Sequence, residues 1–125
     1  MDENALAREI VDAAYTVHKE LGPGLLESVY EAALCHELLE RNILFSRQHW
    51  IPVTYKNLPV MDAFRADILV GGKVIIELKS IETILPVHKK QLITYLRLSG
   101  CRLGLLINFG SDLIKNGITR VVNGL

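Results

Sequence analysis

Three charged residues lie in the most apolar part of the sequence, residues 64–79. Asp67 interrupts one apolar run, Glu77 interrupts the next, and Lys79 follows two positions later. A buried charge is costly unless it is paired or bound to a metal. Two carboxylates on one face are suitable ligands for Mg²⁺ or Mn²⁺, and the backbone carbonyl of Leu78 could be a third. Lys79 beside such an ion would orient or deprotonate a water, or stabilise charge on a phosphate.

A glycine turn decides whether the two carboxylates meet. Because strand side chains alternate between faces, a two-residue turn would place Glu77 on the opposite face from Asp67. A three-residue loop from Gly71 to Lys73 pairs them instead, and its left-handed residue can be glycine. We therefore predict an odd-length or bulged turn, with Arg65 on the face of Asp67. A metal-free cluster of ion pairs at the end of the sheet is the alternative use of the same residues.

The elements around this stretch follow from apolar periodicity. Spacing of three and four residues predicts helices at 4–21, 25–41 and 86–99. Alternation and continuous apolar runs predict strands at 49–56, 60–70, 73–79, 102–108 and 118–122. The resulting order is a helical hairpin, a three-stranded antiparallel meander, a helix and a further strand, with a short last strand. We expect a single α/β domain over residues 1–125, built around one mixed sheet.

Composition narrows the class of protein. Half of the residues are hydrophobic, which is ample for a core, and 14 basic residues balance 14 acidic ones. A protein that coats a duplex is usually basic, so any nucleic-acid contact must come from a local patch. Cys35 and Cys101 are far apart and fit a reduced, cytoplasmic chain. No apolar run approaches the ~20 residues of a membrane span, and residues 1–4 are acidic, unlike a signal peptide.

The spacing of the charged residues resembles a known motif. Asp67 followed by Glu77-Leu78-Lys79 is similar to the core of the PD-(D/E)XK nuclease superfamily, with Ala66 in place of the proline. Gly24, Glu27 and Tyr30 have the spacing of the GxxExxY protein family within that superfamily. Further short segments similar to that family lie at residues 21–24, 64–67, 91–96 and 106–110. The resemblance implies the restriction-endonuclease-like core, in which the meander and a helix precede a parallel strand.

The resemblance also implies companions for the acidic pair. Glu27 would be a third carboxylate at the metal, although complementing the helix dipole is the alternative for an acid in a first helical turn. Tyr30, one turn later, would bind a site carboxylate or pack in the core. Gln91 and Tyr95 are i, i+4 neighbours and resemble the helix motif of RecB-like nucleases, which borders the site.

Two functions from different classes remain. The first is a Mg²⁺- or Mn²⁺-dependent phosphodiesterase acting on DNA or RNA. In it Asp67, Glu77, Glu27 and the Leu78 carbonyl would bind the ion, and Lys79 would position the attacking water, with Gln91 and Tyr95 beside it. The second is a non-catalytic module with the same fold that binds a nucleic acid or a protein. The small, neutral chain favours the second, since it has little surface for a duplex unless it forms a homodimer or joins a larger complex.

Overall fold

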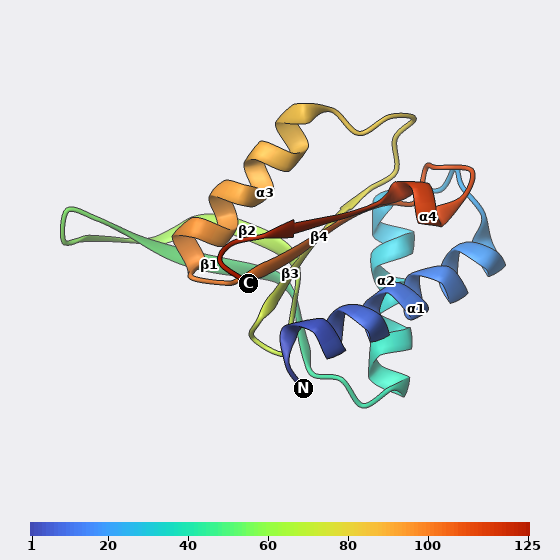
Figure 1. Cartoon of the computed structure of the whole chain (residues 1–125), viewed down its shortest axis with the longest axis horizontal. Helices are drawn as coiled ribbons and strands as arrows, with labels where there is room; N and C mark the ends of the chain where they lie inside the picture. Colours follow the sequence, from blue (N-terminus) through green and yellow to red (C-terminus); the bar gives the residue numbers. More distant parts are fainter.

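The computed structural model describes residues 1–125 and has helices on both faces of one sheet (Figure 1). The helices are α1 (Glu3–Leu21), α2 (Glu27–Glu40), α3 (Pro86–Ser99) and the short α4 (Ile114–Gly117). The strands are β1 (Phe45–Tyr55), β2 (Leu58–Val70), β3 (Val74–Lys79), β4 (Leu103–Asn108) and β5 (Ile118–Val122). No helix has the length and apolar character that crossing a membrane requires.

The sheet has the strand order β1-β2-β3-β4-β5. The first three strands form an antiparallel meander, and β4 lies parallel to β3 after the crossover through α3. The last strand, β5, is antiparallel to β4. This confirms the predicted mixed sheet and its order of elements. The β1–β2 hairpin is longer than expected, and its distal half protrudes from the body as an arm (Figure 1).

Residues close in the sequence determine where several helices and strands begin and end. Helix α1 begins after Asp2, whose side chain accepts a hydrogen bond from Ala5 N at 2.8 Å, so the helix starts one residue before the predicted residue 4. Helix α3 ends as predicted at Gly100, which is left-handed with φ 78°. The arm turns through Lys56 and Asn57 alone, both with positive φ, so the connection is shorter than the gap between the predicted strands 49–56 and 60–70.

Two hydrophobic cores lie on opposite faces of the sheet. The larger core fills the space between the sheet and α1 and α2, and Ile10, Leu34 and Ile76 are fully buried in it. The smaller core lies under α3 and includes Ile75 and Leu92. Alternate residues of β3 therefore face different helices, as expected for a strand covered on both sides.

Candidate functional site

The sheet divides at the acidic pair. The β2–β3 ladder contains only three pairs and ends at Ile68 opposite Ile76. Beyond this point β2 remains paired with β1 out to the tip of the arm, while β3 remains paired with β4 as far as Lys79. Asp67 therefore lies on one branch of a fork, and Glu77 and Lys79 lie on the other.

The turn before the fork has the predicted length. Val70 pairs with Val74, so the loop contains three residues, and both of its glycines are left-handed, with φ 58° at Gly71 and 68° at Gly72. Asp67 and Glu77 are the next residues in this register. The turn thus has the length that a shared site requires, although the β2–β3 ladder ends one residue before this pair.

The alternation of side chains along β2 is broken at Asp67. Phe64 and Ala66 pack in the core under α3, whereas Ile68 packs in the core on the opposite face. The predicted alternation, which placed Arg65, Asp67 and Leu69 on one face, is therefore wrong. Leu69 packs in the core under α3, as Phe64 and Ala66 do, and Arg65 between them faces the other way. The partner strand changes at the same point: Gln48, which lies opposite Asp67, has φ 48°, an uncommon conformation for a residue other than glycine.

The two carboxyl groups are electrostatic neighbours. Burial, and after it the adjacent Asp67 carboxylate, raise the pKa of Glu77 to about 8, while the charge of Lys79 opposes the shift. One oxygen of Glu77, Oε1, is buried and has no hydrogen-bond partner. Asp67 Oδ2 accepts a hydrogen bond from Leu78 N at 2.8 Å, which links the two branches of the fork.

A cavity of about 130 Å³ opens between the start of α2 and the fork. Its lining residues are Glu27, Ser28, Glu31, Gln48, Asp67 and Leu78. The structure thus brings the expected residues Glu27, Asp67 and Leu78 to one space. Glu27 is solvent-exposed, so its carboxylate can reach this space without the cost of burial.

Glu31 and Gln48 were not predicted from the sequence. Glu31 is buried, with 8% of its surface exposed, and accepts hydrogen bonds from Arg47 Nη2 at 3.0 Å and from Gln48 Nε2. A buried carboxylate satisfied by two donors ties α2 to β1 beside the cavity. The spacing in the sequence could have predicted Glu31, because it follows Glu27 by one helical turn and therefore lies on the same face of the helix.

Lys79 is held through its backbone. Its carbonyl accepts a hydrogen bond from Phe109 N at 2.9 Å. The buried side chain of Asn108 accepts from Ile81 N at 3.0 Å and donates to Ile81 O at 2.9 Å. Gly110 is required next to this contact, because a Cβ there would lie 2.2 Å from Ile81 O. These contacts fix the segment that follows β3.

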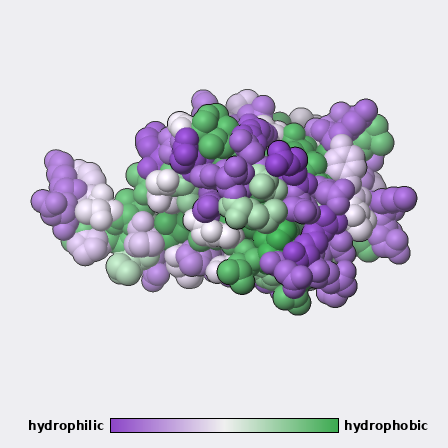
Figure 2. All heavy atoms as spheres, turned by 60° about the horizontal axis from the view of Figure 1, so that its bottom comes forward, coloured by the Kyte–Doolittle hydropathy of each residue, from purple (hydrophilic) through white to green (hydrophobic).

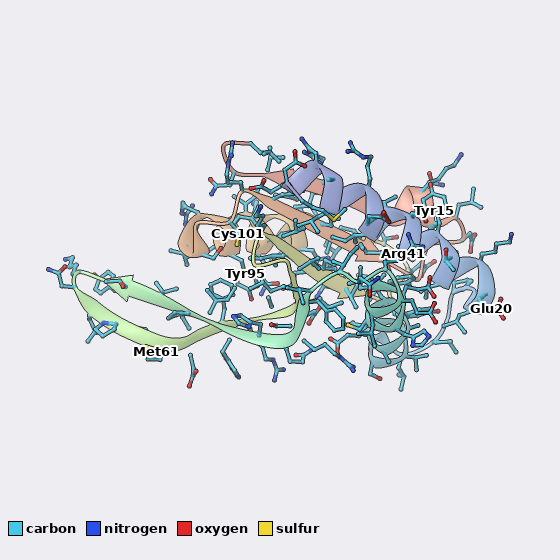
Figure 3. The ribbon with its side chains drawn as sticks, turned by 90° about the horizontal axis from the view of Figure 1, so that it is seen from below. Tyr15, Glu20, Arg41, Met61, Tyr95 and Cys101 are labelled. Atoms are coloured by element: carbon cyan, nitrogen blue, oxygen red, sulfur yellow. The ribbon has the colours of Figure 1, made fainter.

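Helix α3 contributes Tyr95 from the other face. Its ring stacks on Phe64 with centroids 4.1 Å apart, at the base of the arm (Figure 3). Burial raises the pKa of Tyr95, and the charges of Glu77 and Asp67 raise it further. Gln91, one turn earlier, is exposed. His88 has a local role, since its Nδ1 accepts a hydrogen bond from Leu85 N at the start of the helix.

Tyr30 is a core residue and does not contact the acidic pair. It is fully buried, its hydroxyl donates to Gly22 O and accepts from Leu25 N at 3.1 Å, and its ring stacks on Phe109 at 4.5 Å. Of the two uses that the sequence left open for Tyr30, the structure has the core one. Its hydroxyl holds the loop between α1 and α2.

The donor set is compatible with a hard divalent cation. No three histidine, cysteine or acidic side chains form a group that could hold an ion by themselves. The pair of Asp67 and Glu77 nevertheless offers oxygen ligands, and the unpartnered Glu77 Oε1 is a buried acceptor that a cation would satisfy. The Leu78 carbonyl and waters would complete such a set.

One comparison with known proteins identifies the family of the chain. A family model described as the PD-(D/E)XK nuclease superfamily matches residues 4–121, nearly the whole chain. Neither curated proteins nor solved structures give a significant match.

Proposed function

Since the chain belongs to the PD-(D/E)XK nuclease superfamily, we propose that it is a metal-dependent phosphodiesterase that hydrolyses DNA or RNA. One observation carries the proposal: Asp67 and Glu77 are neighbours at the fork, and Glu77 has a buried oxygen without a partner. A merely structural carboxylate at that depth would be expected to have its hydrogen bonds satisfied.

We assign the chain further to the GxxExxY group, because each residue of that signature has a distinct place. Gly24 has φ 102°, a conformation that favours glycine. Glu27 lines the cavity with Asp67, and Tyr30 holds the preceding loop. The signature would thus position the start of α2 against the fork.

The roles of the residues follow from their positions. Asp67, Glu77 and the Leu78 carbonyl would hold Mg²⁺ or Mn²⁺, with Glu27 assisting through water. The ion would supply Lewis acidity toward the phosphoryl oxygens and lower the pKa of a bound water. Lys79 would orient the attacking water and balance the charge on the phosphate. Gln91 and Tyr95 on α3 would border the site and contact substrate.

The test is hydrolysis of labelled single- and double-stranded DNA and RNA with Mg²⁺ or Mn²⁺. Asp67→Asn and Lys79→Met should each lower the rate by about 100-fold or more, because each removes a group from the reacting centre. Glu20→Gln, which changes an exposed acid at the end of α1, should leave the rate unchanged. Equal rates for wild type and Asp67→Asn would contradict the proposal.

The alternative function is a non-catalytic module that binds a nucleic acid or a protein, and the two are separated by titration with Mn²⁺. An enzyme should bind the ion, and the Asp67→Asn and Glu77→Gln variants should lose that binding. Binding of nucleic acid without cleavage, and without any effect of Mn²⁺, would favour the module.

A further inference from the structure

The buried carboxylate of Glu31 on α2 is bound on both of its oxygens by the base of the arm. Its Oε2 accepts hydrogen bonds from Arg47 Nη2 at 3.0 Å and from Arg47 Nε at 3.2 Å, and its Oε1 accepts one from Gln48 Nε2. Hydrogen bonds between a guanidinium and a carboxylate belong to the strong class. Both oxygens of Glu31 therefore have protein donors, in contrast to Glu77 Oε1, which has none.

One of the residues that Glu31 holds has an uncommon backbone conformation. Gln48 has φ 48°, a left-handed value that is unfavourable for glutamine and persists where the surroundings hold it. Arg47 pairs with Ile68 and His49 pairs with Ala66, so Gln48 lies opposite Asp67. The kink in β1 is thus directly across the ladder from a candidate metal ligand.

The kink coincides with the break in alternation that gives Asp67 its direction. Ile68 faces α1 and α2, so regular alternation would turn Asp67 toward α3. Asp67 instead lines the cavity at the start of α2, and its Oδ2 accepts the hydrogen bond from Leu78 N at 2.8 Å. The local geometry of this one pair of residues therefore decides where the Asp67 carboxylate lies.

The arm depends on side-chain contacts at its base for its orientation. Figure 2 shows the arm projecting from the body, with hydrophilic residues at its tip. Beyond the fork its strands pair with each other and not with β3. At the base, Tyr95 stacks on Phe64 from the side of α3, and Glu31 binds Arg47 and Gln48 from the side of α2. The base of the arm is therefore held on both faces of the sheet.

We propose that Glu31 is a positioning residue for the metal site: it holds the kink at Gln48, and the kink directs Asp67 toward the cavity. The inference deepens the proposed function and rests on it, because Asp67 is the ligand that is positioned. Loss of a group that orients a metal ligand lowers metal affinity or activity by about 10- to 100-fold. An ion pair that only supports the fold would lower stability and leave both unchanged.

The test exchanges the hydrogen-bonding roles of two residues. In Glu31→Gln the new amide nitrogen must face either Arg47 or Gln48, so a donor meets a donor and one hydrogen bond is lost. Adding Gln48→Glu restores the set, because the amide at position 31 then accepts from Arg47 and donates to the carboxylate at position 48. The double variant should therefore recover what Glu31→Gln loses.

The first measurement needs neither metal nor substrate. Hydrogen exchange of the Leu78 amide, followed by NMR in EDTA, reports on its bond to Asp67 Oδ2. Glu31→Gln should speed this exchange by about fivefold to tenfold, the net worth of one hydrogen bond, and the double variant should restore protection. Asp67→Ala gives the rate expected when the bond is absent.

The second measurement addresses the metal and the reaction. Glu31→Gln should weaken binding of Mn²⁺ in calorimetry by about tenfold or more and lower kcat similarly. KM for the nucleic acid should stay unchanged, because Glu31 does not touch substrate. Glu37→Gln is the matched control: it removes another ion-paired acid of α2, 3.6 Å from Arg41 and outside the cavity. It should leave Leu78 exchange, Mn²⁺ affinity and kcat as in wild type.

A further variant applies if Glu31→Gln does not fold. Gln48→Gly removes the donor at an exposed position where glycine adopts the same φ freely. It frees the backbone from its tie to Glu31, so exchange of Leu78 and affinity for Mn²⁺ should change in the same directions.

The outcomes separate this inference from the nuclease activity. Unchanged exchange of Leu78 in Glu31→Gln would overturn the inference, as would a faster exchange that the amides of β4 share equally. A double variant that stays as fast as Glu31→Gln would overturn the role of these hydrogen bonds. A wild type that cuts, with Mn²⁺ affinity and kcat unaffected by Glu31→Gln, would overturn the inference and leave the nuclease standing. If nothing is cut but Leu78 exchange responds as expected, Glu31 positions Asp67 and the nuclease proposal fails.

Discussion

At the scale of single residues, the acidic pair is unfavourable for the metal-free protein but suited to binding a cation. Burial and the neighbouring Asp67 make the ionised form of Glu77 unfavourable in the metal-free protein, which holds its pKa at about 8. A divalent cation would reverse this preference, because it favours the carboxylate over the acid. Glu77 is therefore expected to exchange a proton for a metal ion near neutral pH.

The raised pKa predicts that the metal-free protein loses stability as the pH rises. Between the ordinary value of 4.5 and about 8, the folded protein keeps a proton that the unfolded chain has released. Ionisation of Glu77 therefore lowers the free energy of the unfolded state more than that of the folded state as pH increases through this window. Urea unfolding in EDTA should show a free energy of unfolding lower by roughly 4 kcal/mol above the window than below it.

The Glu77→Gln variant is the matched test of that prediction, because glutamine has nearly the same shape and does not titrate. Its stability should vary much less over the same range of pH. Glu82→Gln changes an exposed acid five residues away and should keep the wild-type slope. A wild-type slope in the Glu77→Gln protein would assign the effect to another group.

At the scale of elements, α2 is the helix on which the site depends. It carries Glu27 and Glu31 toward the cavity, and it packs Tyr30 and Leu34 in the larger core. Cys35 is also buried on this helix, and burial raises the pKa of its thiol to about 11, as expected of a core residue. Any displacement of α2 would therefore move the site and loosen the core together.

Arg41, just after α2, fixes this helix against α1. Its guanidinium lies 3.0 Å from Glu9 Oε2 and 2.7 Å from Asp12 Oδ2, both on α1, and 3.6 Å from Glu37 Oε1. Its side chain is only 23% exposed, so this network is less screened by solvent than an isolated surface pair. These ion pairs also offset repulsion within the acidic hairpin.

We expect Arg41→Met to lower the free energy of unfolding by about 1–2 kcal/mol, because three carboxylates lose their shared cation. The loss should shrink at high salt, which screens the remaining repulsion. Lys19→Met changes an exposed cation of the same hairpin that forms no ion pair and should stay within about 0.5 kcal/mol of wild type. Equal effects of the two changes in denaturant titrations would show that the network adds no stability.

At the scale of the whole molecule, the charges are segregated along the sequence but meet in the fold. Residues 1–40 carry nine acidic and two basic residues, and residues 41–125 carry five acidic and twelve basic ones. Arg41 and Arg47, from the second part, form ion pairs with acids of α1 and α2. These contacts between the two parts hold the helical hairpin against the rest of the molecule.

The sequence alone determined the elements and their order, because apolar periodicity, caps and glycine turns are local properties. It also determined the length of the loop after β2, and with it the register of β2 and β3, since the side-chain period of a strand is two. The bounds of β1 and the start of α1 were less accurate, because exposed strands and helix ends have weaker patterns.

Only the tertiary structure decided how the site is assembled. The change of faces at Gln48 and Asp67, the fork in the sheet, and the meeting of Glu31 with Arg47 depend on contacts between residues distant in the chain. The same holds for Tyr30, whose place in the core follows from the packing of Phe109 from the other end of the sequence. Burial and long-range electrostatics are properties of the packed chain, so no local pattern could have shown that Glu77 keeps an unpartnered oxygen.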